Sequence, residues 1–343
     1  MKNLVSNIKK GRRIGRGYFG EVFLGTDDVH GKVAIKVLRR KGNELQTEWD
    51  ARKAALLKEA QNLKRARHVN VVEVYHLVRA ETDDAVLYVM QYCEKGCLLK
   101  SYKNGPLTLE NTRKIATGVT MGLTSLHAKK MIHRDIKPSN ILVTGNGTIK
   151  LGDFGLVTDN LIMGYASAQG YVDHLAPEIW AGKGTSVKTD IWALGITLYR
   201  LLHGEAWYSS QTRPRNIVAN GGYADTLDWL PHIPKKWRTT IRKMLKDNPT
   251  ERYQTGQQVL KAIASLPTEK NWTCTVKSSE ITWTRKTPNR SINVIWKIHS
   301  ARKHEWKAWS QPLGAGKKHT LGESKGIIGR NEAMKQLEAF FKK

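Results

Sequence analysis

Six short motifs follow one another in one order along this chain of 343 residues, and their order constrains the fold more than any other feature. They are Gly15-Arg-Gly17-Tyr-Phe-Gly20-Glu-Val22, Val33-Ala-Ile-Lys36, His133-Arg-Asp135-Ile-Lys137-Pro-Ser-Asn140, Asp153-Phe154-Gly155, Ala176-Pro-Glu178 and Asp190-Ile-Trp192-Ala-Leu-Gly195. The glycine triplet alone is a weak signal, because dinucleotide-binding folds show the same spacing. The ordered set is far more specific than any of its members.

Taken together, the motifs supply the groups that phosphoryl transfer from ATP requires, and they resemble the eukaryotic-type (Hanks-type) serine/threonine protein kinase family over residues 8–266. The resemblance implies a two-lobed α+β fold, with a β-rich N-lobe at residues 8–92 and a mainly helical C-lobe at residues 93–266. The local pattern agrees with it: apolar residues recur at helical spacing over residues 46–67, and strand-like segments flank them. The strands are expected at residues 14–25 (a hairpin), 32–38, 71–77 and 85–92.

ATP and Mg²⁺ are the cofactors that the resemblance implies. Glycines let backbone N–H groups approach the phosphates without obstruction by side chains. The residues implied to bind the nucleotide are Gly15, Gly17, Gly20, Val22, Ala34, Lys36, Met90, Tyr92, Cys93 and Leu142.

Lys36 would contact the α- and β-phosphates and needs an acidic partner from the following helix. Glu59 is the favoured partner, because it precedes His68-Val-Asn70 by nine residues as the family's helix glutamate does. Glu48 is another candidate, and Glu59 could instead be a solvated helix residue.

Four residues of the later motifs would carry the transfer itself. Asp135 would accept or orient the proton of the attacking hydroxyl, and Lys137 would neutralise the γ-phosphate. Asn140 and Asp153 would hold magnesium, since their oxygens suit this ion. For each residue the alternative is a surface or capping role.

Two further pairings and one apolar column follow from the resemblance. Asp190 is expected to accept hydrogen bonds from the backbone of the catalytic loop, and Glu178 to pair with Arg252. Leu63, Val74, His133 and Phe154 could stack as an apolar column between the lobes, which plain core packing would describe equally well.

The segment before Ala176-Pro-Glu178 carries both a regulatory hypothesis and a departure from the family. Arg134 beside the presumed base is typical of enzymes whose activation loop needs an anionic partner. The candidate acceptors are Thr158, Tyr165, Ser167 and Tyr171, with Ser167 favoured because it lies among small residues. Tyr171 stands where these kinases usually have Thr, and His174 where they usually have Tyr. Serine/threonine specificity therefore rests on Lys137.

A second, small α+β domain of no recognised family is expected at residues 270–343. Its last 73 residues carry 15 Lys and Arg, 5 acidic residues and five of the eleven tryptophans. Strands are expected at residues 272–276, 281–285, 292–298 and 305–309, a loop at 314–318 and a terminal helix at 331–341. Trp283, Trp296, Trp306 and Trp309 could stack on nucleic-acid bases, but we favour a core role, because small domains depend on aromatic burial.

The whole chain is strongly basic, with 57 Lys and Arg against 30 Asp and Glu and a net charge of +27. This charge would attract nucleic acid, acidic proteins or anionic membrane, or it could be a generally basic surface. No run of 18 apolar residues, no signal peptide and three cysteines without metal-ligand spacing together favour a soluble cytoplasmic protein.

The sequence therefore predicts a kinase that transfers the γ-phosphoryl group of ATP to Ser/Thr hydroxyls of protein substrates, itself included. The alternative is a pseudokinase or scaffold whose C-terminal domain binds nucleic acid or a partner. The presence of Lys36, Asp135, Asn140 and Asp153 argues against it. A small-molecule kinase is a third option, and the retained Ala176-Pro-Glu178 argues against that one.

Overall fold

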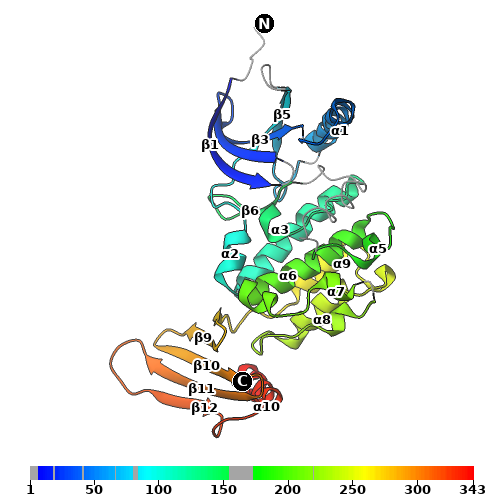
Figure 1. Cartoon of the computed structure of the whole chain (residues 1–343). Helices are drawn as coiled ribbons and strands as arrows, with labels where there is room; N and C mark the ends of the chain where they lie inside the picture. The colour runs from blue at the N-terminus through cyan, green and yellow to red at the C-terminus, as the bar shows by residue number, and fades with distance from the viewer. Residues whose placement is uncertain are drawn as a thin grey trace.

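The computed structural model describes residues 7–17, 20–40, 42–65, 67–79, 84–153, 173–218 and 220–343, without the side chains of residues 55, 57–65, 215 and 216. Three bodies follow one another along the chain: a β-rich N-lobe, a helical C-lobe and a C-terminal sheet domain (Figure 1). This is the kinase fold with an additional antiparallel sheet at its C-terminal end.

The N-lobe is a five-stranded antiparallel sheet with one helix beside it. The strands lie in the order β1-β2-β3-β5-β4. Their bounds are β1 Ile8–Gly17, β2 Gly20–Asp27, β3 Gly31–Arg39, β4 Val74–Arg79 and β5 Ala85–Gln91, and the helix is α1 Gln46–Arg65.

Strand β3 is buried on both faces, which explains its almost continuous apolar sequence. Leu38 packs on one side with Trp49 of α1. Val33 and Ile35 pack on the other side with Val89 of β5. The central strand that carries Lys36 is therefore held rigidly between two small cores.

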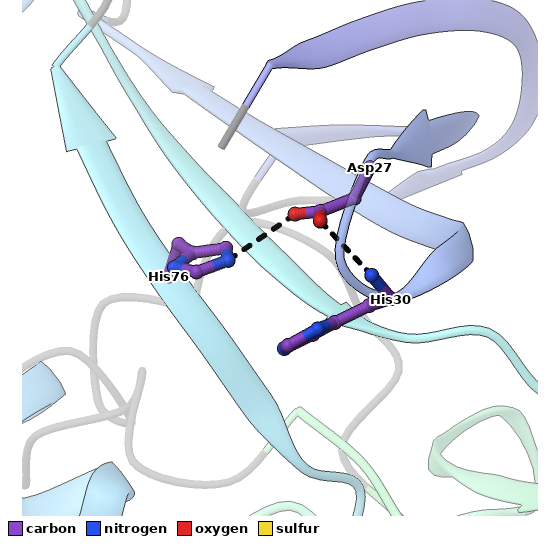
Figure 2. A group of neighbouring side chains, drawn as sticks. All are labelled: Asp27, His30 and His76. Carbon is purple, nitrogen blue, oxygen red and sulfur yellow. Dashed lines mark hydrogen bonds and ion pairs between the residues drawn. The ribbon is translucent and has the colours of Figure 1, made fainter. Parts of the chain in front are cut away.

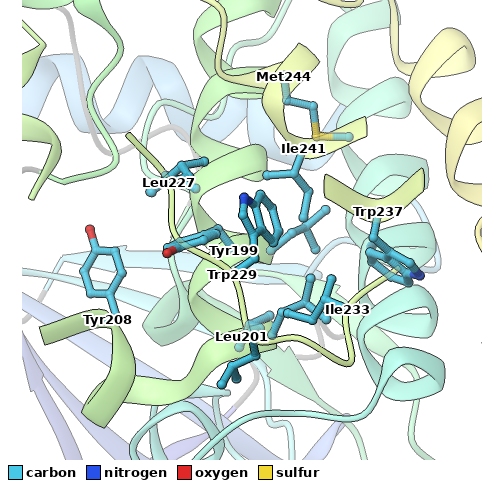
Figure 3. Packing of buried hydrophobic residues seen from close by; sticks show 14 of the residues in the cluster. Tyr199, Leu201, Tyr208, Leu227, Trp229, Ile233, Trp237, Ile241 and Met244 are labelled. Atoms are coloured by element: carbon cyan, nitrogen blue, oxygen red, sulfur yellow. The ribbon is translucent and has the colours of Figure 1, made fainter. Parts of the chain in front are cut away.

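The C-lobe is built around α6, whose side chains are buried over nearly its whole length. Its elements are α2 Leu99–Asn104, α3 Leu109–Ala128, η1 Pro138–Asn140, β6 Ile141–Val143, β7 Ile149–Leu151, α5 Pro177–Trp180, α6 Val187–Ser209, α7 Pro214–Ile217, η2 Tyr223–Asp225, α8 Lys235–Met244, η3 Pro249–Glu251 and α9 Gly256–Ala264. Figure 3 shows Tyr199 of α6 close to Trp229, with Ile241 and Met244 of α8 in the same core.

The ends of α6 follow from local sequence. Ser186 begins the helix with a capping box, in which its side chain accepts from the Lys188 N–H at 3.1 Å and Thr189 bonds back to its backbone. Gly204 interrupts the helix at φ 71°, where a Cβ atom would lie 2.5 Å from the Gly105 backbone. This position therefore requires glycine.

The C-terminal domain is a five-stranded antiparallel sheet in the order β12-β11-β10-β9-β8, covered on one face by a helix. The elements are β8 Thr273–Val276, β9 Glu280–Lys286, β10 Arg290–Ser300, β11 Lys303–Pro312, β12 His319–Glu323 and α10 Arg330–Lys342. Trp296 pairs in register with Ile281 on one side and Trp306 on the other. Because alternate residues share a face, these side chains all point into the same core.

This domain shares one continuous apolar core with the C-lobe. The indole N–H of Trp283 donates to Nδ1 of His232 in the C-lobe at 2.9 Å, and both side chains are buried. Phe341 of α10 packs edge-on against both rings. The sheet domain is thus docked firmly on the kinase C-lobe.

The predicted helix at residues 46–67 is confirmed as α1, and the predicted terminal helix as α10. The strand expected at 71–77 starts later, at Val74, because Val71 makes an isolated bridge to Leu151 of the C-lobe. Strand β12 was not predicted, since its sequence is short, polar and exposed. Within the described ranges, no helix combines the length and apolarity that a membrane span needs.

Candidate active site

The catalytic loop is held by hydrogen bonds to Asp190, which lies near the start of α6. The fully buried Asp190 carboxylate accepts the backbone N–H of His133 and that of Arg134, each at 2.8 Å. His127 of α3 lies 2.8 Å from the same carboxylate. The expected role of Asp190 is confirmed, and it fixes the loop despite the positive φ of 70° at Arg134.

The ring of His133 ties this loop to the strand that leads to Asp153. Its Nδ1 accepts the Asp135 N–H at 3.3 Å, and its Nε2 lies 3.1 Å from the Gly152 carbonyl oxygen. Nε2 therefore carries the proton and donates to that oxygen. Burial lowers the His133 pKa, so the ring is neutral at pH 7.

Asp135 is buried and surrounded by polar side chains. Its Oδ1 lies 2.8 Å from Nζ of Lys137 and 3.0 Å from Nε2 of His174. The Asn140 amide donates to Oδ2 at 2.7 Å and to the Asp135 backbone oxygen at 2.8 Å. Burial alone would raise the Asp135 pKa, but the Lys137 ammonium and His174 outweigh it and lower the pKa below its ordinary value. The carboxylate is thus ionised at neutral pH.

Lys36 and Asp153 bring the two lobes together. The Lys36 ammonium, 3% exposed, lies 2.9 Å from Oδ1 of Asp153, whose side chain is 38% exposed. Asp153 has a positive φ of 56°. The side chain of Glu59 lies outside the described residues, as do those of Leu63 and Phe154. The predicted pairing of Lys36 with Glu59 therefore stays a prediction.

The residues assigned to the nucleotide lie on neighbouring strands. Gly15 pairs with Val22, Val22 with Lys36, and Ala34 with Met90. Gly20 has φ 141°, and a Cβ atom there would lie 2.2 Å from the Val37 carbonyl oxygen. Only glycine fits this backbone turn.

The remaining nucleotide positions lie where the two lobes join. Tyr92 and Cys93 follow β5 directly, and Leu142 lies on β6. Cys93 is buried, and burial raises the pKa of its thiol to about 11. It is therefore a packing residue without thiolate character at neutral pH.

The donor set suits magnesium and a nucleotide. Both amide hydrogens of Asn140 point at Asp135, so its Oδ1 is the atom that can face a cation. Asp153 offers a partly exposed carboxylate close to the Lys36 ammonium, which can neutralise phosphate charge. The described side chains thus fit the cofactors that the sequence implied.

The Ala-Pro-Glu motif is anchored as expected. The Arg252 guanidinium donates to both Glu178 oxygens, at 2.7 and 2.8 Å, in a buried bidentate pair. The Asp173 carboxylate accepts the Tyr208 hydroxyl at 2.9 Å. The candidate phosphoacceptors Thr158, Tyr165, Ser167 and Tyr171 lie outside the described residues.

Asp27, His30 and His76 form a separate polar cluster in the N-lobe (Figure 2). One potential metal-ligand atom from each side chain lies within 4.8 Å of the other two. The Asp27 Oδ1 accepts the N–H of Val29 at 2.7 Å and that of His30 at 3.0 Å. Its Oδ2 lies 3.2 Å from Nε2 of His76. The two backbone contacts fix the turn between β2 and β3, and the third contact joins this turn to β4.

Comparison with known proteins identifies the family. The protein kinase domain model matches residues 8–262, so the chain belongs to the protein kinase family. The chain is 34% identical over 260 residues to the serine/threonine-protein kinase PrkC of Bacillus subtilis (strain 168), a match that covers 72% of this chain and 38% of PrkC. It is 31% identical over 260 residues to Aurora kinase C of Mus musculus, covering 74% of this chain and 90% of that protein.

A third relative is the mitogen-activated protein kinase kinase kinase YODA of Arabidopsis thaliana, 31% identical over 257 residues. That match covers 74% of this chain and 28% of YODA. The chain thus spans well under half the length of PrkC and of YODA. This chain shares its family with these three proteins, but the similarity does not assign their substrates or partners to it.

Sequence reasoning missed one contact of the site. It noted His174 as a departure from the family but gave it no place beside Asp135. The two residues are 39 positions apart, so no spacing rule joins them. The only available signal was the replacement of the tyrosine common in the family by histidine at position 174.

Proposed function

We propose that this protein is an active serine/threonine protein kinase that transfers the γ-phosphoryl group of Mg-ATP to hydroxyls of protein substrates. The observation that carries this proposal is the geometry around Asp135. An ionised carboxylate is held between Lys137 and Asn140, while Lys36 meets Asp153 across the lobe junction. These are the charges that phosphoryl transfer requires.

Each residue has a part in this proposal. Asp135 receives or orients the proton of the substrate hydroxyl, and Lys137 stabilises charge on the transferred group. Asn140 and Asp153 hold magnesium, which neutralises the phosphate oxygens when it is bound. Lys36 positions the α- and β-phosphates beneath the glycine turn at Gly20.

Transfer of label from γ-labelled Mg-ATP to generic protein substrates tests the activity, with Asp153→Ala as the inactive comparison. The expected result is label on serine and threonine with the wild-type protein and none with the variant. Nucleotide binding without transfer in either protein would favour the pseudokinase alternative. Label on tyrosine alone would contradict the assigned specificity.

We also propose that the kinase phosphorylates itself at Ser167 and that its activation loop needs this phosphate for full activity. Arg134 supports this proposal, since a phosphate near its guanidinium would form a charge-assisted hydrogen bond. Mapping of the label on the wild-type protein tests the site. Full activity of Ser167→Ala would contradict it.

For the C-terminal domain, we propose a structural role as part of the C-lobe in preference to nucleic-acid binding. Trp283, Trp296 and Trp306 are buried and cannot stack on bases, whereas Trp309 lies on the other face beneath Lys318. Steeply salt-dependent binding of a polynucleotide, abolished by Trp309→Ala, would reverse this preference. We further propose a cytoplasmic location, to which the three free cysteines are suited.

A further inference from the structure

His174 lies at the start of the short stretch that leads into Ala176-Pro-Glu178, and its ring is buried. Its Nε2 atom is 3.0 Å from Oδ1 of Asp135, the residue assigned as the base. A side chain from the segment that leads into Ala176-Pro-Glu178 therefore contacts the residue that we propose as the base. Within the described ranges, no other residue of this segment forms a hydrogen bond or ion pair with the Asp135 side chain.

The contact completes a ring of neighbours around the carboxylate. Lys137 approaches Oδ1 at 2.8 Å, and Asn140 donates to Oδ2 at 2.7 Å. Lys137 and Asn140 belong to the same loop as Asp135, so they move with it. His174 comes from elsewhere in the chain and fixes the carboxylate relative to the rest of the C-lobe. A base must face its substrate proton at hydrogen-bonding distance, so this orientation bears on the rate.

His174 is itself held in place on both sides. Asp173 accepts the Tyr208 hydroxyl at 2.9 Å, and Glu178 forms its buried pair with Arg252. The backbone between these anchors has little freedom to shift. The ring can therefore act as a fixed support for Asp135.

The charge state of the ring suits this task. Burial lowers the His174 pKa; the Asp135 carboxylate opposes this effect, and the Lys137 and Arg200 cations add to it. The ring is neutral at pH 7, with Nε2 at 3.0 Å from Oδ1 of Asp135, while Nδ1 has no hydrogen-bond partner among the described residues. A neutral donor orients the carboxylate without adding a second full positive charge beside it.

We propose that His174 is a positioning residue that orients Asp135 for proton transfer and links the base to the anchored Ala-Pro-Glu segment. This inference rests on the proposed kinase activity. It concerns a residue at which this chain departs from the tyrosine common in the family, so it is a property of this chain.

The test compares kcat and the KM values for ATP and a protein substrate in the wild type, His174→Phe and His174→Gln. Phenylalanine keeps a planar ring without nitrogen, whereas glutamine places an N–H close to the position of Nε2. We expect His174→Phe to lower kcat about tenfold, the effect of one lost orienting contact, with the KM for ATP unchanged. His174→Gln should recover most of the loss.

His203 provides a matched control, because it is a buried histidine of α6 whose Nδ1 lies 2.7 Å from the Tyr199 carbonyl oxygen. His203→Gln tests whether loss of any buried histidine lowers kcat, with thermal unfolding followed for every variant. His174→Leu gives the same comparison if His174→Phe does not fold.

The outcomes separate the two proposals. A wild-type protein that transfers no phosphate would contradict the proposed function itself. An active wild type with equal kcat in His174→Phe or His174→Leu would overturn the positioning role. An equal loss of kcat in the glutamine and apolar variants would also overturn it, because the donor would then be irrelevant.

Discussion

Two junctions hold the three bodies of this protein together, and they differ in kind. Between the N-lobe and the C-lobe, the Lys36 ammonium meets the Asp153 carboxylate at 2.9 Å, and a small apolar cluster that contains Trp49 and Val86 also includes Leu126 of α3. Between the C-lobe and the C-terminal sheet, one apolar core continues across, with Trp283 bonded to His232. The first junction joins charges that a nucleotide and magnesium would share, whereas the second is complete within the chain.

This difference indicates that the two lobes can move relative to each other, whereas the C-terminal sheet is held rigidly on the C-lobe. We expect a nucleotide and magnesium to contact this ion pair, so the relative position of the lobes can respond to them. A continuous buried core gains from every atom that it removes from water and has no such dependence. We expect changes at the first junction to affect activity and changes at the second to affect stability.

The largest effect is expected at the polar junction. Lys36→Met keeps the length and the apolar stem of the side chain but removes the charge beside Asp153. Phosphate transfer should fall at least about 100-fold, because the phosphates lose a buried cation, while the unfolding temperature changes little. Steady-state kinetics and thermal unfolding measure both, with the exposed Lys32→Met of the same strand as control. A large drop in stability with retained activity would contradict the contrast between the junctions.

At the apolar junction, Trp283→Ala should destabilise the C-lobe together with the sheet domain. Removal of a fully buried tryptophan costs about 3–5 kcal/mol and leaves the His232 ring without its donor. Denaturant unfolding should show one transition at a lower midpoint. Trp309→Ala, on the opposite face of the sheet, is the matched control and should change little. Two separate transitions would show that the sheet and the C-lobe unfold independently.

Acid should weaken the junction between the C-lobe and the C-terminal sheet. Burial, reinforced by the nearby Arg238 cation, lowers the pKa of His232 to about 3 from its ordinary value of 6.5. The unfolded chain therefore binds a proton at this residue more readily than the folded one, and stability is lost as the pH falls below about 6.5.

At pH 5 the loss attributable to His232 should be about 2 kcal/mol. Chemical denaturation at pH 7 and pH 5 measures it. His232→Gln should reduce the pH dependence, whereas the exposed His319→Gln should leave it as in the wild type. The same slope in all three proteins would assign the acid sensitivity elsewhere.

The smallest effect is expected at the solvent-exposed edge of the junction between the C-lobe and the C-terminal sheet domain. Arg330 pairs with Asp228 between α10 and the C-lobe, and both side chains are partly exposed. Pairs of this kind contribute less than about 1 kcal/mol, because water screens them. Arg330→Ala should shift the denaturation midpoint only slightly, and the shift should vanish at high salt. A loss as large as that of Trp283→Ala would mean that the ion pair governs the docking.

How much of this could be predicted from sequence depends on whether both partners belong to the ordered motifs of the family. The roles of Asp190 and of Glu178 with Arg252 were predicted correctly, because ordered motifs carry the geometry of the family with them. The contact of His174 with Asp135 and that of Trp283 with His232 were not predicted. Each joins residues from different parts of the fold, and only packing in three dimensions brings them together. Strand β12 was missed for a local reason, since its exposed polar residues lack the usual strand pattern.

The continuous core also means that the unit of sequence similarity and the unit of folding do not coincide. The family match stops at residue 262, yet the buried surface of the C-lobe around His232 is covered by Trp283 and Phe341 from beyond that point. A chain shortened to the family boundary would present this apolar surface to water. Such a shortened kinase would be prone to self-association even with every catalytic residue in place.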